Sequence, residues 1–190
     1  MKPKDDDKLA AIAEATFTLV EQAGLSGLTM AAIAQQAGIA TGTLYVYHRS
    51  KEDLLNALYQ RAKGATIEQV MLGYDAAAPF RSRFQRMWLN LVRHRLAHYA
   101  EAVFQEQYYN SPWFSEASRQ LSARFVADWF ANFDDAKTQQ ILKEVPTLLL
   151  VASFMGSVRE TAGLVRSGGL ENNEAHLGLA FGVCWDGLKA

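Results

Sequence analysis

Residues 29–52 read TMAAIAQQAGIATGTLYVYHRSKE, and their periodicity indicates two short helical runs joined by a tight turn. Thr29 can cap a helix that begins after it, because its hydroxyl can accept a hydrogen bond from an otherwise unpaired backbone N–H. The apolar residues that follow recur at the spacing of a single helical face: Met30, Ile33, Ala34 and Ala37. The pattern therefore predicts a first short helix in this stretch.

A turn and a second short helix are predicted next. Gly38 tolerates the left-handed backbone that a helix-ending turn requires. Thr41 can cap the second helix, which carries Leu44 inward and directs Thr43, Tyr45 and Tyr47 outward. The small side chain of Ala34 lets the two helices cross closely. This is the helix-turn-helix arrangement, whose second helix is placed in the major groove of DNA.

The run I-A-x-x-A-G-x-x-x-G-x-L-Y-x-Y-x-x-S-K-E-x-L, from Ile33 to Leu54, closely resembles the DNA-binding signature of the TetR family of transcriptional regulators. The resemblance covers roughly residues 8–60, about a third of the chain. Many members carry Phe where this chain has His48. A histidine there gives either an added phosphate contact or a flat ring that packs.

The resemblance implies an all-α fold with an N-terminal three-helix DNA-binding domain over residues 1–60. A helix over 50–72 links it to a helical bundle over 61–190 for ligand binding and dimerisation. By family habit, the protein is expected to be a cytoplasmic homodimeric repressor that binds an inverted-repeat operator in double-stranded DNA. A small apolar or aromatic inducer of unknown identity is expected to release it.

Carried over residue by residue, the resemblance also assigns DNA contacts within the stretch. Bases or their flanking phosphates are met by Thr41, Gly42, Thr43 and Tyr45, whereas the DNA backbone is met by Thr29, Tyr47, His48 and Lys51. Hydroxyls and helix N-termini suit phosphate oxygens, and threonine methyls suit the thymine methyl. No Arg, Asn or Gln lies within 41–47, so we expect modest sequence specificity assisted by DNA shape. The alternative for Tyr45 is packing against Leu44 and the first helix.

Composition alone does not indicate a DNA-binding protein. The 190 residues are 49% hydrophobic and 21% charged, as in ordinary globular proteins, and the net charge is -1. Residues 1–63 carry seven basic and seven acidic side chains. No acid lies between Ala23 and Ser50, however, and Arg49 and Lys51 lie beside the predicted groove helix. Local charge governs phosphate contact, because salt screens charges beyond about 10 Å.

The remaining chain is predicted to be helical, without strands. Ser50 can cap the helix over 50–72, Gly73 to Pro79 reads as a linker, and the polar run 133–140 reads as a break. Phe17, on the first helix, is expected to pack beneath the helix-turn-helix. The other helices are expected over 5–23, 80–96, 97–110, 113–133, 146–166 and 173–188.

Two further sites are predicted in the bundle. Aromatic residues on its helices are usually core, but the resemblance implies an inducer cavity there, lined by Trp88, Phe104, Tyr108, Trp129, Phe133 and Phe154. Glycines and apolar residues on the final two helices suggest a self-complementary face. We expect the dimer interface to include Met155, Val158, Gly178, Phe181 and Trp185. A two-fold dimer would hold two reading heads about 34 Å apart.

Other functional classes find little support in the sequence. The lone Cys184 excludes an internal disulfide, fits a reducing cytoplasm and reads as a packing residue or a redox sensor. His94 and His98 have metal-compatible spacing, but no HExxH, P-loop or dinucleotide motif is present, so no cofactor, metal or catalysis is expected. The apolar run 145–158 is too short for a membrane span. The alternative is an all-helical ligand carrier or enzyme with a non-functional helix-turn-helix.

Overall fold

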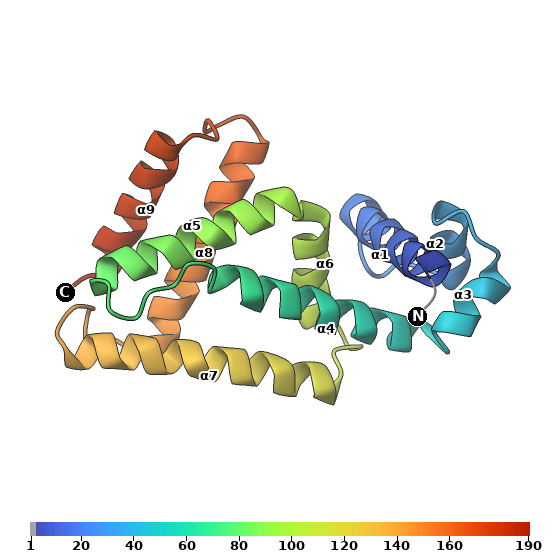
Figure 1. Cartoon of the computed structure of the whole chain (residues 1–190), viewed down its shortest axis with the longest axis horizontal. Helices are drawn as coiled ribbons and strands as arrows, with labels where there is room; N and C mark the ends of the chain where they lie inside the picture. Colours follow the sequence, from blue (N-terminus) through green and yellow to red (C-terminus); the bar gives the residue numbers. More distant parts are fainter. Residues whose placement is uncertain (1–2) are drawn as a thin grey trace. The chain divides into compact units, whose positions relative to one another are not determined.

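The computed structural model describes residues 3–190, except for the side chains of residues 3, 4 and 128, and the described chain forms nine helices and no strand (Figure 1). The predicted all-α class is therefore confirmed. An isolated antiparallel bridge joins Leu142 and Lys189. The helices are α1 Pro3–Ala23, α2 Met30–Gln36, α3 Thr41–Tyr47, α4 Lys51–Val70, α5 Phe80–Ala97, α6 Tyr99–Tyr109, α7 Glu116–Thr138, α8 Thr147–Arg166 and α9 Glu174–Leu188.

The chain packs as two compact units. The first contains the residues up to Gly64 together with 98–121, and the second contains 65–97 together with 122–190. The backbone therefore passes between the units three times: within α4, between α5 and α6, and within α7. Packing thus groups 98–121 with the N-terminal residues, although these residues lie inside the region predicted as the C-terminal bundle. The functional division into 1–60 and 61–190 stays a prediction.

Short-range signals set the helix ends of the first unit as the sequence indicates. Thr29 caps α2, with its hydroxyl accepting from the Ala32 N–H at 3.1 Å, and Ser50 accepts from the Asp53 N–H at 3.1 Å at the start of α4. Gly24 and Gly38 have φ of 79° and 68°, the left-handed conformation that ends α1 and α2. The expected cap of α3 is wrong: Ala40 occupies the cap position, which has no side-chain hydrogen bond, and Thr41 is the first helical residue.

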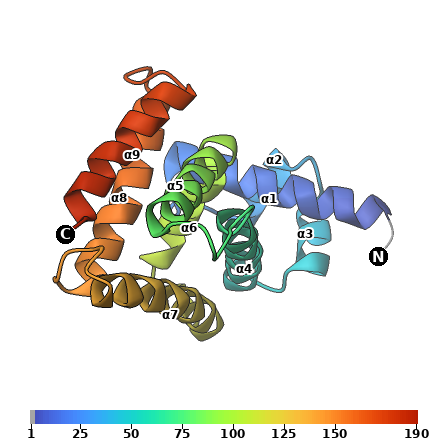
Figure 2. The same cartoon turned by 60° about the vertical axis from the view of Figure 1, so that its left-hand side comes forward.

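The core of the first unit is formed by the first four helices, α1, α2, α3 and α4, together with α6. Two large side chains of α6, Phe104 and Tyr108, are fully buried in it and stack on one another with ring centroids 5.8 Å apart. The ring of Phe17 on α1 lies 5.1 Å from that of Phe104, so α6 supplies its aromatic neighbour. Both views of the molecule show α6 beside α1 (Figure 2). The helix-turn-helix is thus built on a core that α6 completes.

The prediction of a break over 133–140 is wrong, because α7 continues to Thr138. Phe133 and Ala136 extend the buried stripe of Trp129 at helical spacing, and both are fully buried. The polar residues between them face outward, and Lys137 lies 3.7 Å from the Asp134 carboxylate one turn earlier. An amphipathic final turn therefore replaces the expected break.

The second unit packs α5, α8 and α9 around an aromatic core, with the last part of α7 contributing Trp129 and Phe133. Phe84 lies at its centre, 4.5 Å from the ring of Phe154 and 5.2 Å from that of Phe133. Arginines of α5 border the core. Among them, Arg81 lies over the Phe181 ring, and Arg93 pairs with Glu174 at 2.5 Å.

One described helix, α8, is long and apolar enough to cross a membrane by length and composition alone. The apolar run measured on the sequence, 145–158, is shorter than this helix, because α8 continues past the Arg159–Glu160 pair to Arg166. Leu150, Phe154 and Val158 of α8 are buried in the core of the second unit. The apolar character of this helix thus serves, at least in part, packing within the chain.

Candidate nucleic-acid interface

Helix α3 presents a small surface of short and aromatic side chains. Thr41, Gly42 and Tyr45 are exposed, Tyr45 at 50%, while Thr43 is half-buried. Leu44 is 0% exposed and anchors the opposite side of the helix in the core. Tyr45 therefore faces outward, which favours a surface role over packing against Leu44 and the first helix.

Val46 extends this surface and was missing from the predicted contacts. It is 80% exposed, an unusual position for a branched apolar side chain on a short helix. Helical spacing could have found it, since Val46 follows Gly42 by four residues and therefore shares its face. The exposed residues of α3, namely Thr41, Gly42, Tyr45 and Val46, are called the α3 face below.

Tyr47 closes the last turn of α3 against α1. Its hydroxyl donates a hydrogen bond to Asp5 Oδ1 at 2.8 Å. This hydrogen bond is the main cause that raises the pKa of Tyr47 above its ordinary value, and the negative charge of Asp5 adds to it. The Tyr47 hydroxyl thus already has an acceptor, and a DNA phosphate at this position would have to replace a carboxylate.

His48 is an interior residue. It is 8% exposed, and its Nδ1 lies 3.8 Å from the Asp53 carboxylate. Burial lowers the pKa of His48 below its ordinary value of 6.5, against the smaller opposite effect of Asp53. The ring is therefore neutral at pH 7, which favours the packing alternative over a cationic phosphate contact.

Lys51, in the first turn of α4, is held by two groups of its own unit. Its Nζ lies 4.4 Å from the centroid of the Trp113 ring and 3.5 Å from the carbonyl oxygen of Leu25. Nothing in the sequence pattern indicates that Trp113, which follows α6, contacts Lys51. Thr29, the remaining predicted contact, is exposed and uses its hydroxyl as the α2 cap.

The residues predicted to line a ligand pocket are buried, in two separate cores. Phe104 and Tyr108 lie in the first unit, as described above. The other four lie in the second unit, where the Trp129 ring is 5.1 Å from that of Phe154. The structure therefore brings together Trp88, Trp129, Phe133 and Phe154, without Phe104 and Tyr108.

The residues predicted for the dimer interface are mostly turned inward. Val158, Phe181 and Trp185 are buried in the core of the second unit, whereas Met155 is exposed and Gly178 half-buried. The same two helices expose other large apolar side chains to solvent. This set, called the α8–α9 face below, comprises Leu148, Leu149, Met155, Leu164, Leu179 and Val183.

The described residues contain no group of three side chains suited to hold a metal ion. His94 lies 3.3 Å from the Thr66 hydroxyl through its Nε2. Cys184 is a buried free thiol, and burial raises its pKa, with a smaller opposite effect from the Ser157 hydroxyl. A raised pKa disfavours the reactive thiolate, which agrees with a packing role for Cys184.

Two family models match the chain. One, described as "Bacterial regulatory proteins, tetR family", matches residues 12–58, which include the helix-turn-helix. The other, described as "Tetracyclin repressor-like, C-terminal domain", matches residues 79–189, more than half of the chain. The two matches cover most of both compact units.

Individual relatives agree with these matches. An uncharacterized HTH-type transcriptional regulator of Haemophilus influenzae is 30% identical over 91 residues, 48% of this chain and 49% of the relative. The HTH-type transcriptional regulator BetI of Burkholderia thailandensis is 44% identical over 128 residues, 67% of this chain and 45% of the relative. The matches thus span about half or less of the length of these curated relatives.

Solved structures resemble the chain over its whole length. The crystal structure of a TetR family transcription regulator from Marinobacter aquaeolei has a TM-score of 0.88 and 26% sequence identity, covering 100% of this chain and 99% of that chain. A TetR-family regulator from Haemophilus influenzae has a TM-score of 0.75 at 21% identity, covering 100% of each chain, and this likeness supports the fold alone.

The buried neutral His48 predicts a pH-dependent stability. Below pH 6.5 His48 binds a proton more readily in the unfolded chain than in the folded chain. The contribution of the neutral His48 to the free energy of unfolding is therefore complete above pH 6.5 and decreases as the pH is lowered. Thermal unfolding at pH 7.0 and 5.5 should show a larger decrease in Tm for the wild type than for His48→Phe, which cannot titrate. An equal decrease in both proteins would contradict the buried, neutral assignment.

Proposed function

Because the chain belongs to the TetR family of bacterial transcriptional regulators, we propose that it acts as a homodimeric, ligand-responsive repressor. It binds an inverted-repeat operator through the α3 face and leaves it when a small apolar or aromatic molecule binds. The exposure of Tyr45 and Val46 above the buried Leu44 is the observation that carries this proposal. We place the protein in the cytoplasm, where its DNA target lies.

The α3 face supplies contacts without a charged group. The methyls of Thr41 and Val46 suit thymine methyl groups, and the Tyr45 hydroxyl can bond to a base edge or a phosphate. Gly42 is exposed, and an added Cβ there would meet no atom within 4 Å beyond the adjacent residues and its own helix backbone, so DNA backbone can approach closely at this position. Positive charge comes from Arg49 and Lys51, on either side of Ser50.

The α8–α9 face supports the homodimer. Leu148, Ala152 and Met155 follow one another at helical spacing on α8, as do Leu179 and Val183 on α9, and all five are exposed. Large apolar side chains gathered on two neighbouring helices are a liability on a monomer and are typical of an interaction surface. A Cβ added at glycines 156, 163, 178 or 182 would meet no atom within 4 Å beyond the adjacent residues and the backbone of its own helix, which leaves room for a partner helix. We therefore propose these exposed residues for the interface, with Val158, Phe181 and Trp185 behind them.

The aromatic core of the second unit is the proposed ligand site. Its rings pack closely, so a ligand must part them or replace them. Trp88 donates through Nε1 to the Ser157 hydroxyl at 2.8 Å, which places one polar pair in an otherwise apolar setting. Apolar walls with few polar groups favour an apolar or aromatic molecule. Because α4 and α7 are continuous between the units, a ligand that reshapes this core can shift the DNA-competent population.

Removal of the Tyr45 side chain tests the DNA contact. Tyr45→Ala should weaken binding to the DNA that the wild type selects by about tenfold, because a lost groove contact costs on the order of 1–3 kcal/mol. Fluorescence anisotropy at fixed salt measures this change. Tyr45→Phe separates the hydroxyl from the ring. Unchanged affinity in the alanine variant would remove Tyr45 from the DNA contacts.

A charge on the α8–α9 face tests the dimer. Val183, 77% exposed, would be buried against the partner, so Val183→Glu should yield monomers in light scattering coupled to size-exclusion chromatography. Val126→Glu introduces the same charge at an exposed apolar position of α7 and should leave the dimer intact. Dimers of unchanged stability in Val183→Glu would contradict the proposed interface.

A screen of apolar and aromatic molecules tests the ligand site. A molecule that releases the operator should also raise the Tm of the DNA-free protein, because it binds the folded state. Phe154→Leu removes a buried ring of the core and should raise the concentration needed for release about fivefold or more, whereas Val126→Ala should not. If Phe154→Leu does not change the concentration needed for release, the ligand binds at another site.

A further inference from the structure

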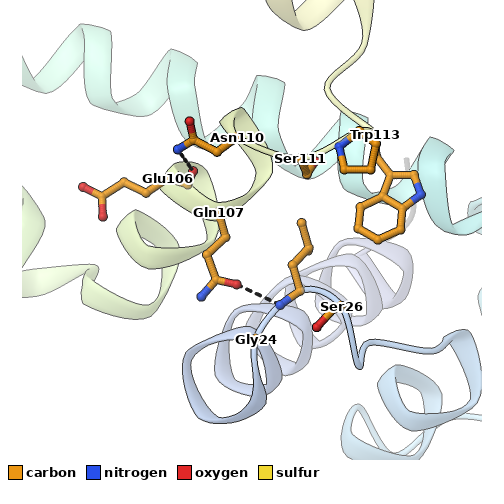
Figure 3. A pocket seen from close by; sticks show the side chains of 9 residues that line it. Gly24, Ser26, Glu106, Gln107, Asn110, Ser111 and Trp113 are labelled. Atoms are coloured by element: carbon orange, nitrogen blue, oxygen red, sulfur yellow. Dashed lines mark hydrogen bonds between the residues drawn. The ribbon is translucent and has the colours of Figure 1, made fainter.

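The loop between α1 and α2 is held from two directions, by α6 and by the first turn of α4. Gln107 Oε1 accepts from the Leu25 N–H at 2.8 Å, and Lys51 reaches the Leu25 carbonyl oxygen from α4. An open groove of about 660 Å³ lies beside the Gln107 contact, with Leu25, Gln107 and Trp113 among its lining residues (Figure 3). The whole arrangement lies within the first unit.

Trp113 gives the Lys51 ammonium a fixed neighbour. At 4.4 Å from the ring centroid, Nζ is well within the distance at which a cation is attracted to an aromatic face. The backbone carbonyl of Trp113 accepts a hydrogen bond from the Tyr108 hydroxyl at 2.9 Å, and Tyr108 is fully buried. The backbone at Trp113 is thus tied to the core of the unit, and its partly buried side chain packs against the same core.

This contact leaves the ammonium able to bind a further acceptor. A lysine ammonium carries three N–H donors. The Leu25 carbonyl can take one, at the long distance of 3.5 Å, while the indole face interacts with the cation as a whole. Donor capacity therefore remains for a phosphate oxygen, and binding DNA does not require Lys51 to leave Trp113.

We propose that Trp113 is a positioning residue for DNA binding: it holds the Lys51 ammonium where a phosphate of the operator backbone will bind. The inference rests on the proposed function, since it needs Lys51 to contact DNA. A lysine side chain that moves freely loses rotamer freedom when it binds a phosphate. One that is already restrained loses less, so its contact contributes more to affinity.

A double-mutant cycle on affinity for the wild-type-selected DNA tests the proposal. Trp113→Leu removes the aromatic face and should weaken binding about 3- to 10-fold, because an unrestrained Lys51 side chain loses more rotamer freedom when it binds a phosphate. Trp113→Phe keeps a ring and should stay within about twofold of the wild type. In a Lys51→Met background, the effect of Trp113→Leu should shrink to less than about twofold, because no ammonium remains to be positioned.

Arg119 offers a matched control in the same unit. Its guanidinium lies 5.2 Å from the Phe114 ring and donates to the Phe114 carbonyl oxygen at 3.0 Å, an arrangement like that of Lys51. Arg119 is not among the proposed DNA contacts, so Arg119→Met should leave DNA affinity unchanged. Thermal unfolding monitors the fold of every variant, and Trp113→Met replaces Trp113→Leu if the leucine variant does not fold.

The outcomes separate this inference from the proposed function. Equal losses from Trp113→Leu with and without Lys51, or no loss at all, would overturn the positioning role while DNA binding stands. No DNA selected by the folded wild type, or full affinity in Lys51→Met, would overturn the assignment of Lys51 and the inference with it. A loss that depends on Lys51 and is rescued by Trp113→Phe supports the proposal.

Discussion

A helix of seven residues cannot hold itself together in water, and this constraint governs the first unit. Isolated helices need about 12–15 residues to be even marginally stable, so α3 depends on its surroundings. Leu44 fixes its inner side in the core, and the His48 N–H donates to the Leu44 carbonyl oxygen at its end. Tyr47 ties the last turn to α1 through Asp5. Side chains that bind DNA must be left without partners in the free protein. The stability of α3 therefore has to come from residues that do not contact DNA.

The same constraint explains why α6 belongs to the first unit. Phe104 and Tyr108 complete the core beneath α1 and α4, and Gln107 holds the loop that leads into α2. Residues from the middle of the chain therefore stabilise a motif near its start. Because the chain then continues through α7 into the second unit, a change in the aromatic core there has a covalent route to the residues that support the α3 face. The contacts of α6 that stabilise the helix-turn-helix would thus also carry the proposed effect of a ligand on DNA binding.

The sequence predicts what local chemistry determines. The caps at Thr29 and Ser50 and the turn at Gly38 depend on a few neighbouring residues, and all three are confirmed. Periodicity shows which side of a helix is apolar but not what covers it, so the partner of α6 and the contact between Trp113 and Lys51 were not predictable. Helices α8 and α9 are apolar around most of their circumference, so pattern alone could not tell buried Phe181 from exposed Leu179. The sequence does not decide between the two roles of His48, because the burial of its side chain is a tertiary property.

Selection of DNA from a random library by the purified chain at moderate salt tests whether a dimer reads DNA through two α3 faces. If two α3 faces read DNA from a two-fold dimer, the selected pool should contain an inverted repeat whose half-sites lie one helical turn apart, about 34 Å. Selection of this repeat would identify the operator and confirm a dimeric reader. No enrichment by a protein shown to be folded and dimeric would contradict the account.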